Sequence, residues 1–113
     1  MTSGDPGYAH QKLALAVHAL AVGAGDVRSR LRNAFLILHV IHERDFPDSL
    51  KDKWRWIKSQ VTRFGPRKDE SGHIYVGSID NTLGRIKNST GTKIAAAIYT
   101  LEGDLEGYLK DLQ

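Results

Sequence analysis

Two arginines and two histidines that could bind a phosphate group lie, with a phenylalanine, along one side of a predicted helix. They are Arg28, Arg32, Phe35, His39 and His42. At about 100° per residue, all five fall within about 80° of one another. Arginine binds phosphate as a bidentate fork, and histidine is a donor that switches near neutral pH. The stripe therefore predicts an anion-binding groove. The alternative is that the arginines extend to solvent and the histidines fill gaps between helices.

A second group combines tryptophan with basic residues. Trp54 and Trp56 lie about 200° apart on a helix, and only Trp54 shares the apolar register. Trp56 is therefore predicted to be exposed, where it could stack on a base or anchor a partner protein. The basic residues assigned to this group are Lys53, Arg55, Arg63 and Arg67. Alternatively, residues 65–77 cover Trp56.

Other chemical patterns are weak. His39, His42 and Glu43 have a helical metal-ligand spacing without a third ligand nearby, so neither a metal nor a cofactor is predicted. Residues 88–93 form either an anion-binding helix start or a simple kink, and they lack the P-loop pattern. No Ser-His-Asp or paired-carboxylate arrangement emerges. These observations favour a non-catalytic protein.

Composition narrows the class of protein further. The 113 residues correspond to one domain, and the absence of cysteine excludes disulfides and thiolate metal sites. A chain without disulfides is typical of the cytoplasm. The first residues lack a signal pattern, and the longest apolar run, residues 34–41, is too short to span a bilayer. Neither a secreted nor a membrane protein is predicted.

Positive charge is concentrated in the middle of the chain. The net charge is +3, but residues 27–68 hold eleven Lys or Arg against four Asp or Glu, and residues 101–113 hold one Lys against four acids. This asymmetry either steers an anionic partner to one end or reflects a mixed solvated surface.

Hydrophobic periodicity predicts helices after a loose tail at residues 1–8. The first spans residues 9–22 and stops at residues 23–25. The second begins at the N-cap Asp26 and ends near Glu43. Its second half is apolar nearly all round, which indicates a central position. The third begins at Pro47 and buries a stripe of side chains. These are Leu50, Trp54, Ile57, Val61 and Phe64.

The remaining chain contains one conflict between local and periodic signals. Residues 67–77 form an ordered loop or a small hairpin. From the N-cap Ser78, one apolar register continues to Tyr108, although residues 88–92 are poor helix formers. One long or gently kinked helix is favoured over two helices. The predicted fold is therefore an all-α antiparallel four-helix bundle in a single domain, residues 9–113.

Two resemblances add expectations. The segment Arg32-Asn33 followed by His39 resembles the signature of HEPN ribonucleases, small helical proteins whose Arg and His face one another across a dimer cleft and cleave RNA without metal. The resemblance implies Arg32, Asn33 and His39 as catalytic residues. However, the apolar segment between Arg32 and His39 favours burial over an open cleft.

Over residues 10–110 the chain also resembles small uncharacterised bacterial proteins. The residues that carry this resemblance are 25–31, 45–47, 56–57, 62–63, 77–79, 82–83, 85–88 and 90–95. It implies a bacterial cytoplasmic accessory protein from a mobile or defence-type gene neighbourhood. The leading hypothesis is thus a non-catalytic adaptor that binds a larger protein or nucleic acid. The alternatives are a ribonuclease and a direct nucleic-acid-binding protein, and a homodimer is compatible with each.

Overall fold

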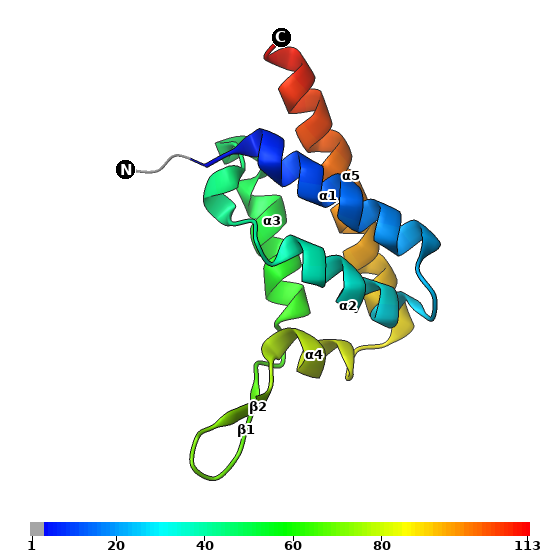
Figure 1. Ribbon diagram of the computed structural model, residues 1–113, viewed down its shortest axis with the longest axis vertical. Helices are drawn as coiled ribbons and strands as arrows, with labels where there is room; N and C mark the ends of the chain where they lie inside the picture. The colour runs from blue at the N-terminus through cyan, green and yellow to red at the C-terminus, as the bar shows by residue number, and fades with distance from the viewer. Residues whose placement is uncertain (1–3) are drawn as a thin grey trace.

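The computed structural model describes residues 4–113 and is mainly helical (Figure 1). Residues 1–3 of the predicted tail lie outside the described residues. The elements are α1 (Pro6–Val22), α2 (Val27–Leu38), the 3₁₀ turn η1 (Glu43–Asp45), α3 (Asp48–Val61), β1 (Arg67–Lys68), β2 (Ile74–Val76), α4 (Ser78–Leu83) and α5 (Asn88–Asp111). The described chain thus has five α-helices, and the predicted four-helix bundle is not confirmed. None of the described helices has the length and apolarity that a membrane crossing requires.

Helix α5 lies at the centre of the packing. It contacts α1, α2 and α3, and its residues Ile94, Ile98, Leu101 and Leu105 are fully buried. These side chains recur at three- and four-residue spacing, which places them on one face of the helix. The predicted central helix was α2. It contacts α1, α4 and α5, but Leu36 in its apolar second half is 68% exposed.

Helix α1 begins earlier than its periodicity predicts. Asp5 is the N-cap, its carboxylate accepts a hydrogen bond from the Tyr8 N–H, and Pro6 occupies the first turn. An Asp-Pro pair favours such a start, since proline has no N–H to leave unpaired. Residues 6–8 therefore belong to the helix and not to the predicted tail.

The predicted N-cap of α2 is confirmed and its predicted end is wrong. Asp26 accepts a hydrogen bond from the Ser29 N–H at 3.0 Å. The helix ends at Leu38, because the following chain turns to bury Ile41 and to place the His42 N–H on the Asp45 carboxylate at 2.8 Å. His42 therefore does not lie on α2.

Helix α3 buries its predicted stripe except for the last residue. Leu50, Trp54, Ile57 and Val61 are buried, whereas Phe64 is 41% exposed. The helix ends at Val61, and Gly65 takes a left-handed conformation with φ of 67°. Phe64 therefore lies beyond the helix and does not continue its stripe, and the left-handed conformation of the following Gly65, which suits glycine, turns the chain away.

Of the two forms predicted for residues 67–77, an ordered loop or a small hairpin, the structure has the hairpin, and the favoured single C-terminal helix is wrong. Strands β1 and β2 pair antiparallel, and the hairpin projects beyond α4 (Figure 1). The helical region is divided into α4 and α5 by residues 84–87, before the predicted weak point. Gly91 lies buried inside α5, where an added Cβ would lie 2.9 Å from the Val27 side chain. This glycine therefore allows α5 to approach α2 closely.

Candidate nucleic-acid interface

Three of the five residues of the predicted stripe, Arg32, Phe35 and His39, line one groove, whereas Arg28 and His42 do not. Arg32, Phe35, Leu36 and His39 form one wall of a hollow of about 470 Å³, and Thr62 with residues 77–80 forms the other. Arg32 and His39 are thus brought to one groove, as the stripe predicts. Asn33, the third residue implied by the HEPN resemblance, is exposed on α2 and does not line this groove.

The arginines of the stripe are held by the protein itself. Arg32 Nε donates a hydrogen bond to the Asp80 carboxylate at 2.9 Å. Arg28 donates to the Asp26 carboxylate and, through Nη1, to the Ile86 carbonyl at 3.2 Å. The Ser29 N–H and the Arg28 side chain lower the pKa of Asp26, so this carboxylate keeps its charge. Neither arginine is therefore a free phosphate ligand.

The two histidines of the stripe lie at the end of α2 and beyond it. His39 is the C-cap of α2, is exposed, and has Nδ1 at 2.7 Å from the Leu36 carbonyl oxygen. It separates the first groove from a second hollow of about 390 Å³, in which His42, Glu43, Arg55 and Lys58 take part. The second hollow is more polar, but its Arg55 already forms an ion pair with Glu43.

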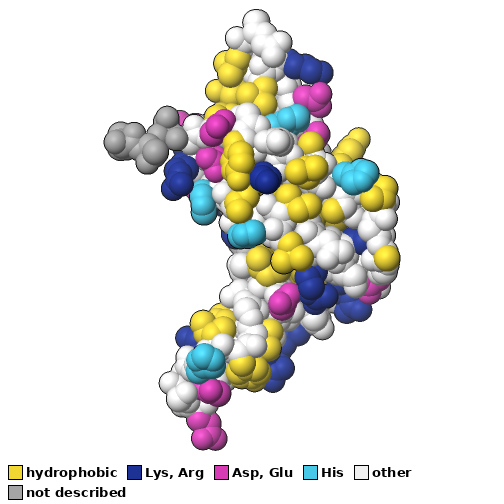
Figure 2. Space-filling view, viewed as in Figure 1, with side chains coloured by type: hydrophobic (Ala, Val, Ile, Leu, Met, Phe, Trp, Pro, Cys, Tyr) yellow, Lys and Arg dark blue, Asp and Glu magenta, His cyan; other side chains and the backbone are white. Residues whose placement is uncertain are grey.

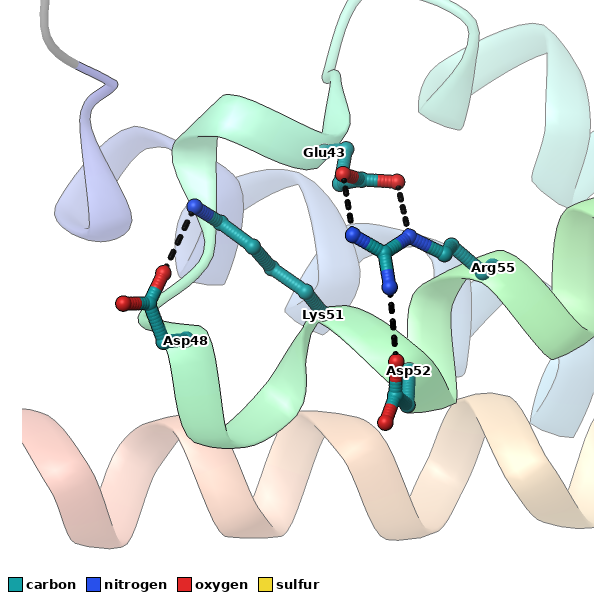
Figure 3. A network of polar contacts seen from close by, with 5 residues as sticks. All are labelled: Glu43, Asp48, Lys51, Asp52 and Arg55. Atoms are coloured by element: carbon teal, nitrogen blue, oxygen red, sulfur yellow. Dashed lines mark hydrogen bonds and ion pairs between the residues drawn. The ribbon is translucent and has the colours of Figure 1, made fainter.

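Arg55 links η1 to α3 (Figure 3). Its Nε and Nη2 donate to both Glu43 oxygens at 2.6 and 2.8 Å, and Nη1 donates to Asp52 at 2.7 Å. The neighbouring Lys51 donates to Asp48 in the same way. The Arg55 hydrogen bonds lower the pKa of Glu43, which keeps the pair ionised. Arg55 thus holds η1 against α3 through its ion pairs. The prediction that it belongs to a binding surface around Trp56 is not supported by these contacts.

Trp56 is exposed as predicted, with 42% of its surface accessible. It lies in a shallow hollow beside Lys53 and the α5 residues Ala96, Ala97 and Thr100. The alternative in which residues 65–77 cover it is wrong. Lys53 pairs with Asp104 across the same helices. The predicted basic group around Trp56 is therefore divided, since Arg63 and Arg67 lie elsewhere.

A different basic surface surrounds the hairpin, and we call it the hairpin face. It consists of Arg63, Phe64, Arg67, Tyr75 and Arg85. The guanidinium groups of Arg63 and Arg85 lie 5.4 and 5.5 Å from the Phe64 ring centroid, and that of Arg67 lies 5.7 Å from the Tyr75 ring centroid. These distances are typical of cation–π contacts.

The charges of the hairpin face are available to a ligand. Among residues 4–113, none of its three arginines forms an ion pair with a carboxylate, and the same holds for the neighbouring Lys68 and Lys87. Phe64 and Tyr75 are 41% and 56% exposed. Figure 2 shows Lys and Arg side chains gathered around the hairpin and on the part of the body next to it. Exposed aromatic rings therefore alternate with unpaired cations on this face.

Helix α4 fixes the position of this face. Thr82 and Asn81 are buried side chains on α4. Thr82 Oγ1 accepts a hydrogen bond from the Phe64 N–H at 3.0 Å, and Asn81 Nδ2 donates a hydrogen bond to the Gly65 carbonyl at 2.9 Å. These two hydrogen bonds hold the backbone of Phe64 while its ring stays partly exposed.

The tip of the hairpin is held by Asp69. Its carboxylate accepts hydrogen bonds from residues 71 and 73, and those from the Ser71 side chain and the His73 N–H lower the pKa of Asp69.

Two of the five residues of the hairpin face, Arg63 and Arg67, were predicted from the sequence to bind a ligand, but beside Trp56 and not beside Phe64 and Tyr75. Phe64 was predicted to be buried, and no binding role was predicted for Tyr75 or Arg85. The available signal was the segment 63–67, in which two arginines flank an aromatic residue next to the helix-breaking Gly65 and Pro66. An aromatic residue after a helix end has left the buried stripe.

Comparison with known proteins gives no independent support for any function. No family model, curated protein or solved structure matches this chain. The two resemblances drawn from the sequence therefore stay predictions, and function must be argued from the chain's own geometry.

Proposed function

We propose that this is a non-catalytic accessory or adaptor protein of a bacterial, defence-related system that acts in the cytoplasm and binds single-stranded nucleic acid through its basic central region. The contact surface is the hairpin face. The observation that carries the proposal is the set of three arginines stacked on two exposed aromatic rings, with no carboxylate partner in the described chain.

Single-stranded nucleic acid matches this combination of groups. Its unpaired bases stack on aromatic rings regardless of sequence, and its phosphates bind arginine. A duplex would hide its base faces from Phe64 and Tyr75. A protein partner is the alternative, but the cores of protein interfaces are depleted of charge overall, although arginine is enriched there. Three arginines, together with Lys68 and Lys87, form no ion pair in the described chain, and this set of cations favours a polyanion.

Anisotropy of a labelled mixed-sequence RNA and a DNA strand, titrated at several salt concentrations, tests the proposal. We expect binding that weakens steeply with salt. The double variant Arg63→Gln, Arg85→Gln should reduce the salt slope by roughly 0.7 for each lost phosphate contact. The matched control Lys51→Gln, Lys53→Gln removes the same charge from paired lysines and should leave the slope unchanged.

Two results would contradict this function. One is the absence of binding at low salt, together with co-purification of a protein partner that the Arg63→Gln, Arg85→Gln variant loses. The other is an equal loss of affinity in both double variants, since it would mean that only net charge matters. The first result would mean that the hairpin face binds a protein, and the second that it binds nucleic acid only through the net charge of the chain.

A HEPN-like ribonuclease is the second candidate, and the shared groove of Arg32 and His39 favours it. In such an enzyme two copies of the groove would face one another in a homodimer. The test is incubation of RNA in EDTA with the wild type, His39→Ala and Arg32→Ala, with light scattering to establish the oligomeric state. We expect cleavage only by a wild-type dimer in this case. Equal background cleavage by all three proteins would exclude it.

A further inference from the structure

Three potential metal ligands meet between α1 and α5, away from the hairpin face. His10 lies on α1, and Glu102 and Glu106 lie one turn apart on α5. One ligand atom from each residue can be chosen so that the three atoms lie within 4.8 Å of one another, and all three residues are partly buried. The two helices pack directly together. No metal site was predicted from the sequence, because no local spacing links His10 to two glutamates so distant in the chain.

The polar atom at the centre of this group lacks a partner. His10 Nε2 is inaccessible to solvent and forms no hydrogen bond with the described residues. It faces Glu102 Oε1 at 3.4 Å, beyond the usual length of a hydrogen bond between nitrogen and oxygen. A buried nitrogen without a partner is unfavourable, and so are two carboxylates brought close together. A divalent cation would satisfy all three groups.

The distance between the His10 and Glu102 ligand atoms fits a tetrahedral ion, and the Glu106 ligand atom lies within 4.8 Å of both. With metal–ligand bonds of about 2.0–2.2 Å, neighbouring ligand atoms of a tetrahedral site lie about 3.3–3.6 Å apart. The 3.4 Å between His10 Nε2 and Glu102 Oε1 falls within this range. One imidazole and two carboxylates form a donor set that zinc accepts, with a fourth position left for water. The Lys110 ammonium contacts Glu106 Oε1 at 3.2 Å, which leaves the second oxygen of Glu106 for the metal.

We propose that His10, Glu102 and Glu106 bind a zinc ion that clamps α1 onto α5. The site has three protein ligands from two helices that are distant in sequence. Its zinc therefore stabilises the folded chain, since the unfolded chain does not hold the three ligands together. The nucleic-acid proposal does not depend on this site, because no element contributes residues to both.

Thermal unfolding of EDTA-treated protein, with and without added Zn²⁺, is the first test. We expect zinc at about a hundredfold excess over its dissociation constant to raise the Tm by at least about 5 °C. The variants His10→Ala and Glu106→Gln should lose this rise. The exposed His18 lies two turns further along α1, and His18→Ala should keep it. Mg²⁺ should leave the Tm of the wild type unchanged.

Titration with Co²⁺ gives a readout that does not depend on stability. One equivalent should produce the visible absorption of a tetrahedral site in the wild type and His18→Ala, and Zn²⁺ should abolish it. Glu106→Gln keeps the shape of the side chain and should abolish the band even if His10→Ala fails to fold. The absence of the band in the wild type, or a zinc-induced Tm rise equal in all variants, would reduce the group to a His10–Glu102 ion pair.

Discussion

The cations of the binding set predicted on α2 and α3 and the arginines of the hairpin face differ in how their charge is held. On α2 and α3, each cation of the predicted binding set pairs with a carboxylate of the chain. These cations are Arg28, Arg32, Lys53 and Arg55. On the hairpin face, Arg63, Arg67 and Arg85 lie over aromatic rings instead. A carboxylate neutralises a guanidinium, whereas a ring leaves its charge and its N–H donors accessible. Charge counted along a sequence therefore overestimates the charge that a ligand can reach.

Removal of both aromatic rings from the hairpin face should have the largest effect on nucleic-acid binding, and it tests the difference between the two regions most directly. In Phe64→Ala, Tyr75→Ala we expect the affinity for single-stranded nucleic acid to fall by about a hundredfold, because each stacked base contributes about 1–3 kcal/mol. The exposed Tyr99 on α5 provides the control, and Tyr99→Ala should bind as the wild type does. Anisotropy measures both. Unchanged affinity in the double variant would mean that the rings do not stack on bases.

The buried hydroxyl of α4 offers a way to sharpen the comparison. Thr82→Val keeps the side-chain shape but leaves the Phe64 N–H without its acceptor, at a cost of about 1–3 kcal/mol. We expect a Tm lower by several degrees and weaker nucleic-acid binding, measured by thermal unfolding and anisotropy. Thr92→Val, an exposed substitution of the same type, is the control for stability. A loss of stability without any loss of affinity would show that α4 does not position the hairpin face.

The smallest effect is expected at the paired cations. Arg55 lowers the pKa of Glu43, so the pair stabilises the fold above the ordinary Glu pKa of 4.5 and loses this contribution as the pH falls below that value. We expect Arg55→Gln to have a slightly lower Tm than the wild type at neutral pH and an equal Tm at pH values well below 4.5. Its affinity for nucleic acid should not change. Weakened binding in this variant would contradict the division into two regions.

The features that the sequence predicted correctly depend on neighbouring residues. The Asp26 cap, the buried Trp54, the exposed Trp56 and the hairpin all follow from local spacing and turn chemistry. The errors come from contacts between distant residues. Asp80 holds Arg32 from 48 positions away, and Asp104 holds Lys53 from 51 positions away. Periodicity does not reveal such partners, so the accessible cations could not be separated from the occupied ones.

The groove of Arg32 and His39 could be predicted from local spacing, whereas the hairpin face could not. Arg32 on α2 and His39 at its C-cap were correctly assigned to one surface, whereas the hairpin face combines residues that follow α3, residues of β1 and β2, and a residue that follows α4. The end of α2 at Leu38 was missed for a related reason. That end depends on Asp45, which also accepts the Asp5 N–H at the start of α1.

The central position of α5 has a consequence for the order of events during synthesis. The ribosome completes α1, α2 and α3 before residues 88–111 emerge, yet these three helices bury their apolar faces against α5. The side chains of α1, α2 and α3 that pack on α5 therefore stay uncovered until that helix emerges. Products truncated before residue 88 should be targets for chaperones and proteases.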